Sequence, residues 1–391
     1  MQSSYDKFYE LLHLNKTDSL LLQILFSSAK KRKETCHAFL QSFVMEDADG
    51  ETQALMPLFL QVNRQANFDP DIKSRTNSLY RSVMRRNYLN LHGILPLLSA
   101  FNQADIPVML MKGMALGHVY YQDLALRAMG DIDIAVPHHR FAEAYHIALQ
   151  HGFQGDRLLH SADLKKDGQI ALDLHCQIFK ESYAHESRET ILWERAGKVD
   201  FYGSQVCLMS AEDLLLGILL NQFYDTLCPL GQPGRPKKWI VDAAVILQQK
   251  PDFDLELFIQ ACYHFRVMPQ VICMLRSYLK AYSPTFGHYT IDSIVRKLEA
   301  EPEFNKIRMN LFARLWAYRD NPPLINMQKK YLQYMYFSYD QASGRGFGIH
   351  DYKKYTYQKY HADNFYQYIW SNLSRALENL KKKHVSGRSL K

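Results

Sequence analysis

The sequence predicts an α/β fold, of the α+β kind, with a small mixed sheet between one helical region before it and another after it. Residues 131–136 and 169–177 alternate apolar and polar side chains with a period of two, which is typical of strands with one buried face. Apolar residues in the flanking parts recur instead at helical spacing. We therefore expect three regions, 1–104, 105–208 and 209–391, with the sheet in the middle one.

The composition excludes a largely disordered chain. Of the 391 residues, 47% are hydrophobic and 22% are charged, so the chain can bury a sizeable core. The net charge of +7 is mildly basic and favours anionic partners. Nucleotides, nucleic acid and a membrane surface all satisfy that preference, and the charge does not choose among them.

Cysteine usage and the absence of apolar runs predict a cytoplasmic protein. The six cysteines form no closely spaced pair and no zinc-binding pattern, so we expect buried, reduced thiols. The first residues lack a basic segment followed by an apolar one, which argues against a signal peptide. No run approaches the ~20 apolar residues of a membrane span, so we expect no transmembrane segment.

The first region reads as helical and carries no catalytic pattern. Apolar segments at 20–27, 38–44 and 54–62 predict helices, and an acidic, glycine-containing turn at 46–50 separates the last two. A further helix is expected over 88–101, where Pro96 introduces a kink. We expect these helices to cover one face of the core.

The second region opens with a strand that ends in a basic turn. Residues 108–111 form a short apolar run that suits a buried strand. Lys112 and Gly113 interrupt this run, and residues 114–121 then have the composition of a helix.

Two carboxylates share one face of the next predicted strand. Gly130 makes a turn into residues 131–136, whose apolar members point into the core, so Asp131 and Asp133 point the other way. At a rise of ~3.3 Å per residue they lie less than ~7 Å apart and repel each other unless a cation lies between them. Mg²⁺ suits such a site because it prefers carboxylate oxygens.

A further carboxylate is expected on a neighbouring strand. Residues 141–149 predict a helix that ends at Gly152, and strands follow at 157–161 and 169–177 with a polar turn at 163–168 between them.

In the second of these strands, alternation places Asp173 and His175 on one face. Its apolar residues share the opposite face. His175 is expected to be structural rather than catalytic.

The third region is predicted to be helical. Ser210 caps an apolar helix, a loop rich in Pro and Gly spans 222–236, and a helix opens at 237. In that helix we expect Trp239 in the core and Asp242 as a surface charge or cap. Further helices are expected over residues 253–320.

The end of the chain carries a separate compositional signal. A break at 321–323 precedes a stretch dense in Tyr and Lys at 329–360, and an amphipathic helix follows at 366–380. The tyrosines and lysines suit either base stacking with phosphate contacts or a helix surface and partner interface, and the second is favoured. The glycines at 344–348 lack the spacing of a dinucleotide fingerprint and predict a turn.

The central pattern resembles the nucleotidyltransferase superfamily, which includes DNA polymerase beta and small antibiotic-modifying enzymes. It is most similar to an uncharacterised bacterial branch, and the resemblance covers roughly residues 106–247. The positions that match are Lys112, Gly113, Leu116, Tyr120 or Tyr121, Arg127, Gly130, Asp131, Ile132 and Asp133. Two features depart from the wider superfamily: Met114 replaces the second small residue of the turn, and the gap from Gly113 to Asp131 is longer.

The resemblance implies a nucleotidyltransferase catalytic core with a metal site. It assigns Asp131, Asp133 and Asp173 to catalysis and to Mg²⁺ or Mn²⁺, with Asp173 helping to deprotonate the acceptor. The nucleotide-binding set would be Lys112, Gly113, Arg127 and Gly130. For each of these residues a solvated or structural role stays open: a surface charge for Lys112 or Asp173, a salt bridge for Arg127 and an ordinary turn for Gly113.

The implied function is metal-dependent transfer of a nucleoside monophosphate from an NTP, such as ATP, to a hydroxyl or phosphate acceptor. Two alternatives belong to other classes. One is a catalytically inactive nucleotide-binding or scaffold protein, and the other is a basic nucleic-acid-binding protein supported only by the density of Tyr and Lys. The sequence does not indicate the acceptor, the base of the NTP or the oligomeric state.

Overall fold

A computed structural model describes the following residues: 14–27, 29–64, 70–157, 161–167, 170–179, 189–227, 237–265, 267–282, 295–298 and 300. All of them belong to one compact unit that spans residues 1–313. The predicted break at 321–323, the stretch rich in Tyr and Lys and the helix at 366–380 lie outside the described residues. The three-part division of the chain stays a prediction.

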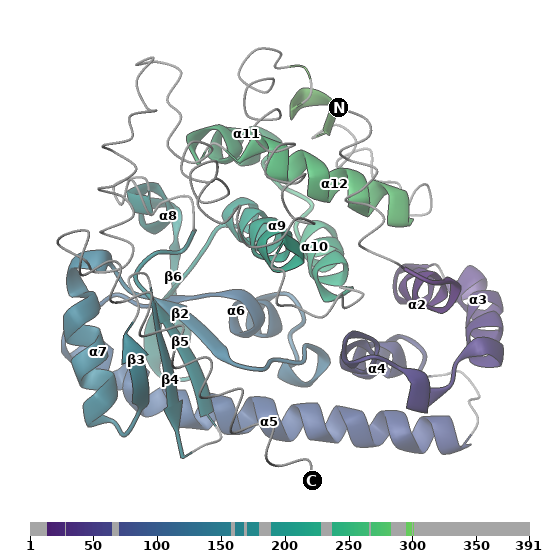
Figure 1. The fold of residues 1–391 in the computed structure, drawn as a ribbon, viewed down its shortest axis with the longest axis horizontal. Helices are drawn as coiled ribbons and strands as arrows, with labels where there is room; N and C mark the ends of the chain where they lie inside the picture. Colours follow the sequence, from purple (N-terminus) through teal and green to yellow (C-terminus); the bar gives the residue numbers. More distant parts are fainter. Residues whose placement is uncertain are drawn as a thin grey trace, which may run out of the picture. The chain divides into compact units, whose positions relative to one another are not determined.

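A seven-stranded mixed sheet occupies the middle of the described chain (Figure 1). Its strands are β1 (Met109–Leu110), β2 (Ile132–Ala135), β3 (Gln154–Arg157), β4 (Ser161–Lys166), β5 (Ile170–His175), β6 (Gly197–Phe201) and β7 (Ser204–Leu208). They lie in the order β3-β4-β5-β2-β1-β7-β6. The pairs β2–β5 and β1–β7 are parallel, and the other four pairs are antiparallel. The expected mixed sheet is confirmed.

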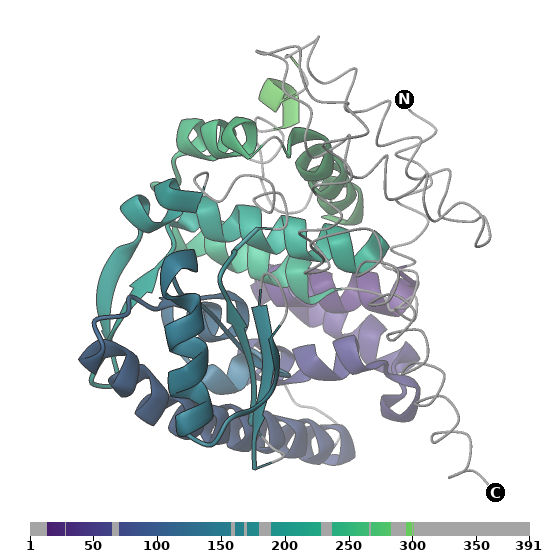
Figure 2. The same cartoon turned by 60° about the vertical axis from the view of Figure 1, so that its left-hand side comes forward.

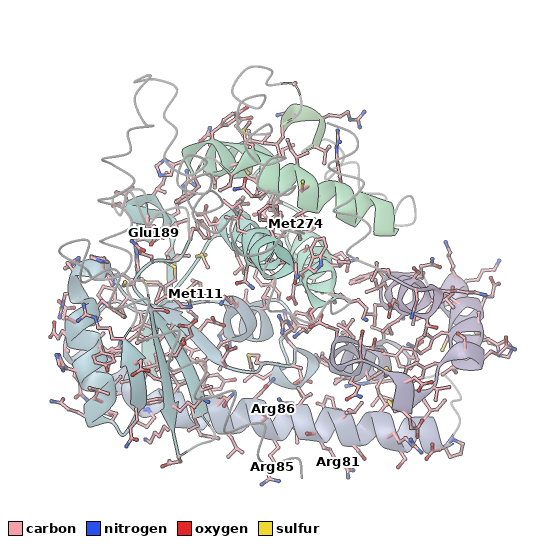
Figure 3. All side chains as sticks on the ribbon, in the orientation of Figure 1. Arg81, Arg85, Arg86, Met111, Glu189 and Met274 are labelled. Carbon is pink, nitrogen blue, oxygen red and sulfur yellow. The ribbon has the colours of Figure 1, made fainter. Side chains whose placement is uncertain are left out.

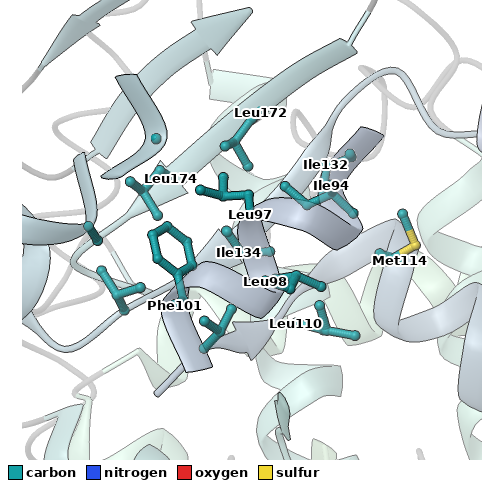
Figure 4. Packing of buried hydrophobic residues seen from close by; sticks show 14 of the residues in the cluster. Ile94, Leu97, Leu98, Phe101, Leu110, Met114, Ile132, Ile134, Leu172 and Leu174 are labelled. Atoms are coloured by element: carbon teal, nitrogen blue, oxygen red, sulfur yellow. The ribbon is translucent and has the colours of Figure 1, made fainter. Parts of the chain in front are cut away.

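One face of this sheet is the main hydrophobic core. Helices α5 (Pro70–Gln103) and α7 (Phe141–Gln150) pack on it, and α5 contributes Ile94, Leu97 and Phe101 (Figure 4). The apolar members of the alternating strands all face this cluster, as predicted; they are Ile132, Ile134, Val136, Leu172, Leu174 and Cys176. Their burial fixes the direction of the intervening polar side chains, which must point to the opposite face.

The first region is helical, as expected. Helices α2 (Lys16–Phe26), α3 (Ala29–Ser42) and α4 (Gly50–Val62), with the short η1 (Met45–Asp47), precede α5. Helix α5 is far longer than predicted: it begins at Pro70 and continues past Pro96 for 34 residues in all. Its arginines Arg81 and Arg85 are exposed along the side away from the strands (Figure 3).

The remaining helical segments follow in the chain between and after the strands. They are α6 (Lys112–Val119), η2 (Leu124–Leu126), η3 (His138–Arg140), α8 (Thr190–Arg195), α9 (Ala211–Leu227), α10 (Lys238–Gln249), α11 (Leu255–His264) and α12 (Met268–Tyr282). Figures 1 and 2 both show α9 to α12 together on the side away from α5. Ser210 caps α9 as predicted, because its Oγ accepts the Asp213 amide at 3.1 Å. None of the described helices is both long and apolar enough to cross a membrane.

The predicted polar turn at 163–168 is wrong. Residues Ser161–Lys166 form β4, in which Ala162 and Leu164 are buried while Asp163 and Lys165 are exposed. The polar composition therefore reflects a strand next to the sheet edge, which has one buried apolar face and one exposed polar face, rather than a turn. Strand β3 also ends at Arg157, where the sequence predicted a strand to begin.

Three other boundaries differ from the prediction. Strand β1 covers only two of the four residues at 108–111, and α6 begins at Lys112 rather than at 114. The predicted loop at 222–236 starts too early, because α9 continues to Leu227. The five cysteines that the structure describes are buried and reduced, as expected.

Candidate active site

The register of two parallel strands brings the predicted carboxylates together. Strands β2 and β5 pair Asp133 directly with Asp173, on the face opposite the core. His175 is two residues further along β5. Its Nε2 lies 2.9 Å from Asp173 Oδ2 and 3.3 Å from Asp133 Oδ1. One ligand atom from each of the three residues lies within 4.8 Å of the others, so the three side chains could hold a metal ion.

Burial makes this cluster sensitive to charge. Asp133 is 4% exposed, and burial alone would raise its pKa, but the hydrogen bond from His175 and the charge of Lys112 outweigh burial and lower it. Burial opposes the charged form of His175 too, yet the hydrogen bonds to Asp133 and Asp173 raise its pKa to about 9. Without a metal ion, these hydrogen bonds favour the imidazolium form of His175 at neutral pH; as a metal ligand His175 would have to be neutral.

Lys112 supplies a second positive charge. It lies two residues after the end of β1, begins α6 and has a backbone φ of +42°, a left-handed conformation that is unusual for a side-chain-bearing residue. Its Nζ forms an ion pair with Asp133 Oδ1. From the sequence we expected Lys112 either to contact phosphate or to be solvated, and the ion pair with Asp133 was not expected. The phosphate contact stays a prediction.

Asp131 stands apart from the Asp133–Asp173–His175 cluster. It precedes β2 by one residue and is exposed. Although the residue is exposed as a whole, neighbouring atoms partly desolvate its carboxyl group. This desolvation and the nearby charge of Asp133 raise the pKa of Asp131, so the two carboxylates repel each other. Whether Asp131 ligates a metal stays a prediction.

A cavity of about 330 Å³ opens beside Asp131 and Asp133. Every residue of the predicted nucleotide-binding set lines it: Lys112, Gly113, Arg127 and Gly130. Helix α6 begins at this cavity, and its N-cap residue Met111 makes no side-chain capping hydrogen bond, so the first amides of the helix keep their capacity to bind an anion.

Gly113 is required by close packing at this helix start. A Cβ built on Gly113 would lie 2.5 Å from Cγ of Met129, which is buried at 4% exposure. A residue with a side chain would displace Met129. With glycine at this position, the backbone of residue 113 itself lines the cavity.

Arg127 lines the cavity but its guanidinium is already engaged. Nε and Nη2 each donate to one carboxylate oxygen of Asp242 on α10, both at 2.8 Å, and the Tyr121 hydroxyl donates to the same carboxylate at 2.7 Å. Asp242 is 2% exposed, so the expectation of a surface charge or cap at that position is wrong, whereas Trp239 is buried as predicted. This pair ties the loop before β2 to α10, and the role of Arg127 as a phosphate clamp stays a prediction.

Two residues that the sequence interpretation missed also line the cavity, Asn221 on α9 and Lys238 on α10. Lys238 pairs with Glu51 on α4 at 3.0 Å, and the Glu51 carboxylate also accepts the backbone amides of Lys237 and Lys238 at 3.0 and 2.9 Å. The basic pair that opens α10 was visible in the sequence, but nothing there indicated which helix end faces the strands.

A row of four carboxylates crosses the same face of the sheet. The registers pair Asp156 with Asp163, Asp163 with Asp173, and Asp173 with Asp133. Asp156 and Asp163 are exposed and Asp133 is buried, so burial increases from the sheet edge toward the site. Burial and the charge of Asp173 raise the pKa of Asp163.

Comparison with solved structures gives weak matches, among them the following two. The solution structure of the antibiotic-resistance factor ANT(2'')-Ia is 15% identical over 46% of this chain and 92% of its own, with a TM-score of 0.33. An antigenic nucleotidyltransferase-like protein from Paracoccidioides brasiliensis is 16% identical over 51% of this chain and 97% of its own, with a TM-score of 0.32. No curated protein matches the chain.

A protein-family model gives the decisive comparison. The family described as uncharacterised nucleotidyltransferase matches residues 50–278, which is more than half of the chain and includes every predicted site residue. The match begins at α4 and ends in α12, so it extends beyond the sheet on both sides. The chain is a nucleotidyltransferase and belongs to this uncharacterised family.

Proposed function

We propose that the protein transfers a nucleoside monophosphate from an NTP to a hydroxyl or phosphate acceptor, with Mg²⁺ or Mn²⁺ as the cofactor. The observation that carries this proposal is the Asp133–Asp173–His175 cluster next to a cavity with cationic walls. In the reaction, an acceptor oxygen forms a bond to the α-phosphorus, the bond to the β-phosphate oxygen breaks, and pyrophosphate leaves.

The donor set fits a hard divalent cation. Asp173 Oδ1 is buried and has no hydrogen-bond partner among the described residues, so one carboxylate oxygen at the site is left without a donor. Carboxylate oxygens are the ligands that Mg²⁺ and Mn²⁺ prefer. Asp133, Asp173 and Asp131 would hold the metal, which supplies positive charge to the reacting phosphate and to the leaving oxygen.

The cavity has the charge that a triphosphate requires. Lys112 and Lys238 line it, and the start of α6 directs backbone amides toward it. Arg127 also contributes positive charge there, although Asp242 takes two of its donors. This end of the site is therefore where we place the β- and γ-phosphates.

The chain's own residues then have separate roles. Asp173 lies at the junction between the buried carboxylate and the exposed row, so it is the residue that we assign to proton removal from the acceptor hydroxyl. His175 orients both carboxylates through Nε2. Asp242 keeps Arg127 and the loop before β2 in place.

The test is to incubate the protein with each α-³²P-labelled NTP and Mg²⁺ in cell extract and to follow the label. We expect a nucleoside monophosphate linked to a discrete acceptor, and no label after addition of a chelator. Asp173→Asn should lose the label, whereas Asp156→Asn, which removes an exposed carboxylate two strands away, should keep it. Transfer that persists in Asp173→Asn would remove that residue from its assigned role.

The two alternatives make different predictions in the same assay. An inactive nucleotide-binding protein would bind Mg²⁺–NTP without any metal-dependent turnover. A nucleic-acid-binding protein would instead show RNA or DNA affinity that falls steeply with salt concentration.

A further inference from the structure

A second cavity lies past the ends of the two strands that carry the metal site. It has a volume of about 500 Å³, and its lining includes Pro107, Pro137, Gln177, Trp193, Lys198 and Cys207. Pro137 follows the end of β2, and Gln177 follows the end of β5 by two residues. Glu189, the N-cap residue of α8, also lines the cavity, and Figure 3 shows its position.

Gln177 is the polar group that calls for a ligand. It is 6% exposed, and its Oε1 is buried without a hydrogen-bond partner among the residues that the structure describes. A buried amide oxygen without a donor carries an energetic penalty that a bound molecule with an N–H or O–H group would remove.

The turn that carries Gln177 is fixed in place. Oε1 of Glu189 accepts the backbone amides of Ile178 and Phe179 at 2.7 and 2.8 Å. These bonds hold the backbone directly after Gln177 before any ligand arrives.

The walls of the cavity favour a flat, uncharged ring. Two prolines and the half-buried indole of Trp193 provide apolar surfaces, and the size is that of a small-molecule site. The negative charge of Glu189 is directed at backbone amides, and the positive charge of Lys198 lies on an exposed side chain. A carboxamide offers one acceptor beside one donor, which matches the edge of a nucleobase, as Gln and Asn do when they recognise adenine.

We propose that this cavity binds a nucleobase, with the Gln177 amide reading its edge and Trp193 lying against its face. The proposal rests on the proposed nucleotidyl transfer and adds the site for the base. Gln177 lies four positions after Asp173, at most roughly 13 Å away at ~3.3 Å per extended residue, a gap that the sugar and base of a nucleotide attached at the metal site would cross. The base belongs either to the NTP or to a nucleotide-type acceptor.

Calorimetric binding with defined probes tests this assignment. The probes are inorganic tripolyphosphate with Mg²⁺, non-hydrolysable analogues of ATP, CTP, GTP and UTP, and the four free nucleosides. The variants are Gln177→Leu, Trp193→Ala and the control Gln150→Leu, an exposed glutamine at the end of α7. Trp193→Ala provides a second probe of the cavity if Gln177→Leu does not fold.

If the base of the NTP binds here, one analogue will bind more tightly than the others, and Gln177→Leu or Trp193→Ala will weaken it about tenfold without changing tripolyphosphate affinity. If the acceptor's base binds here, a nucleoside will bind together with the preferred analogue, and the same variants will abolish that binding. Unchanged nucleoside and analogue affinities in both variants overturn the proposal. Failure of tripolyphosphate to bind wild-type protein would instead count against the proposed function.

Discussion

Two lysines in this chain each lie between aspartates, and their surroundings differ in one decisive respect. Lys237 is 0% exposed, and its Nζ lies 3.0 Å from Asp18 on α2 and 2.9 Å from Asp49, the N-cap residue of α4. Lys112 pairs with Asp133, but its own side chain is 33% exposed and lines a cavity. The first lysine joins helices from distant parts of the sequence, whereas the second remains accessible to solvent and ligands.

The difference lies in whether other groups already satisfy the carboxylates. The Asp18 carboxylate also accepts the Asn15 backbone amide at 3.1 Å, and the Asp49 carboxylate accepts the Thr52 amide at 2.7 Å, so the Lys237 cluster is closed. At the Lys112 cluster, Asp173 Oδ1 is buried without a partner among the described residues. A buried charge cluster with complete hydrogen bonding stabilises the fold, and an incomplete one beside a cavity marks a site.

The largest expected effect of a single substitution is at Asp133, in the incomplete cluster. We expect Asp133→Asn to reduce nucleotidyl transfer by more than about a thousandfold, because metal-borne charge stabilisation is worth several kcal/mol. The variant should still fold, because Asn has nearly the same size as Asp and its side-chain oxygen can still accept hydrogen bonds from Lys112 and His175. Near-wild-type turnover would show that the metal assignment is wrong; label transfer and circular dichroism measure the two properties.

Lys237→Met tests the closed cluster. Removal of one partner leaves Asp18 buried without its countercharge, so we expect the free energy of unfolding to fall by about 3–5 kcal/mol. Lys250→Met is the matched control, because Lys250 pairs with Asp252 at the surface and should change stability by less than about 1 kcal/mol. Urea unfolding followed by circular dichroism measures both. Equal effects of the two substitutions would remove the distinction drawn here.

Arg127 belongs to both categories, since it is buried against Asp242 and also lines the cavity. Arg127→Lys replaces a two-pronged contact with a single point charge, so unfolding should become easier by about 1–3 kcal/mol. If the guanidinium also contacts phosphate, the apparent KM for NTP will rise. A loss of stability with unchanged nucleotide kinetics would assign Arg127 to the closed kind of cluster alone.

Lys112→Met sharpens the comparison through two effects of opposite sign. Without the competing ammonium, Mn²⁺ should bind the carboxylates more tightly, whereas tripolyphosphate should bind less tightly. Each change should be up to about fivefold, since a partly exposed ion pair is worth at most about 1 kcal/mol. Calorimetric titrations give both constants. Weaker binding of both probes would indicate that Lys112 only supports the local structure.

A separate prediction concerns His175 and the pH dependence of stability. Its pKa in the folded state is about 9, above the ordinary 6.5, so its contribution to stability is complete below pH 6.5 and disappears as the pH rises through 9. In chelator-treated protein, the free energy of unfolding should therefore fall over this interval. His175→Gln should remove this part of the slope, and His146→Gln, an exposed control on α7, should not.

The sequence was informative where alternation and burial coincide. Asp133, Asp173 and His175 point away from the core because their apolar neighbours point into it, and period-two patterning is visible in one sequence. Asp133 pairs with Asp173 across β2 and β5, and the role of Asp173 as a third catalytic carboxylate stays a prediction.

The features that the sequence did not predict depend mainly on contacts between residues far apart in the chain. The Arg127–Asp242 pair joins residues 115 positions apart, and the Lys237 and Glu51 contacts join residues 186 or more apart. No local pattern reports such distances, so Asp242 was expected at the surface. Strands β6 and β7 were not predicted, because much of β6 is exposed and little of it alternates.

Strand β1 contributes only Met109 and Leu110, yet it is the link between the group β3-β4-β5-β2 and the hairpin β7-β6. The backbone hydrogen bonds that unite the two groups lie at this segment and its two flanking residues: Cys207 N donates to Val108 O at 2.7 Å, and Met111 N donates to Asp133 O at 3.1 Å. Amide hydrogen exchange at Met109 and Leu110 should consequently report the cohesion of the whole sheet. If these amides exchange earlier than those of β2 and β5, the two groups open as separate cooperative units.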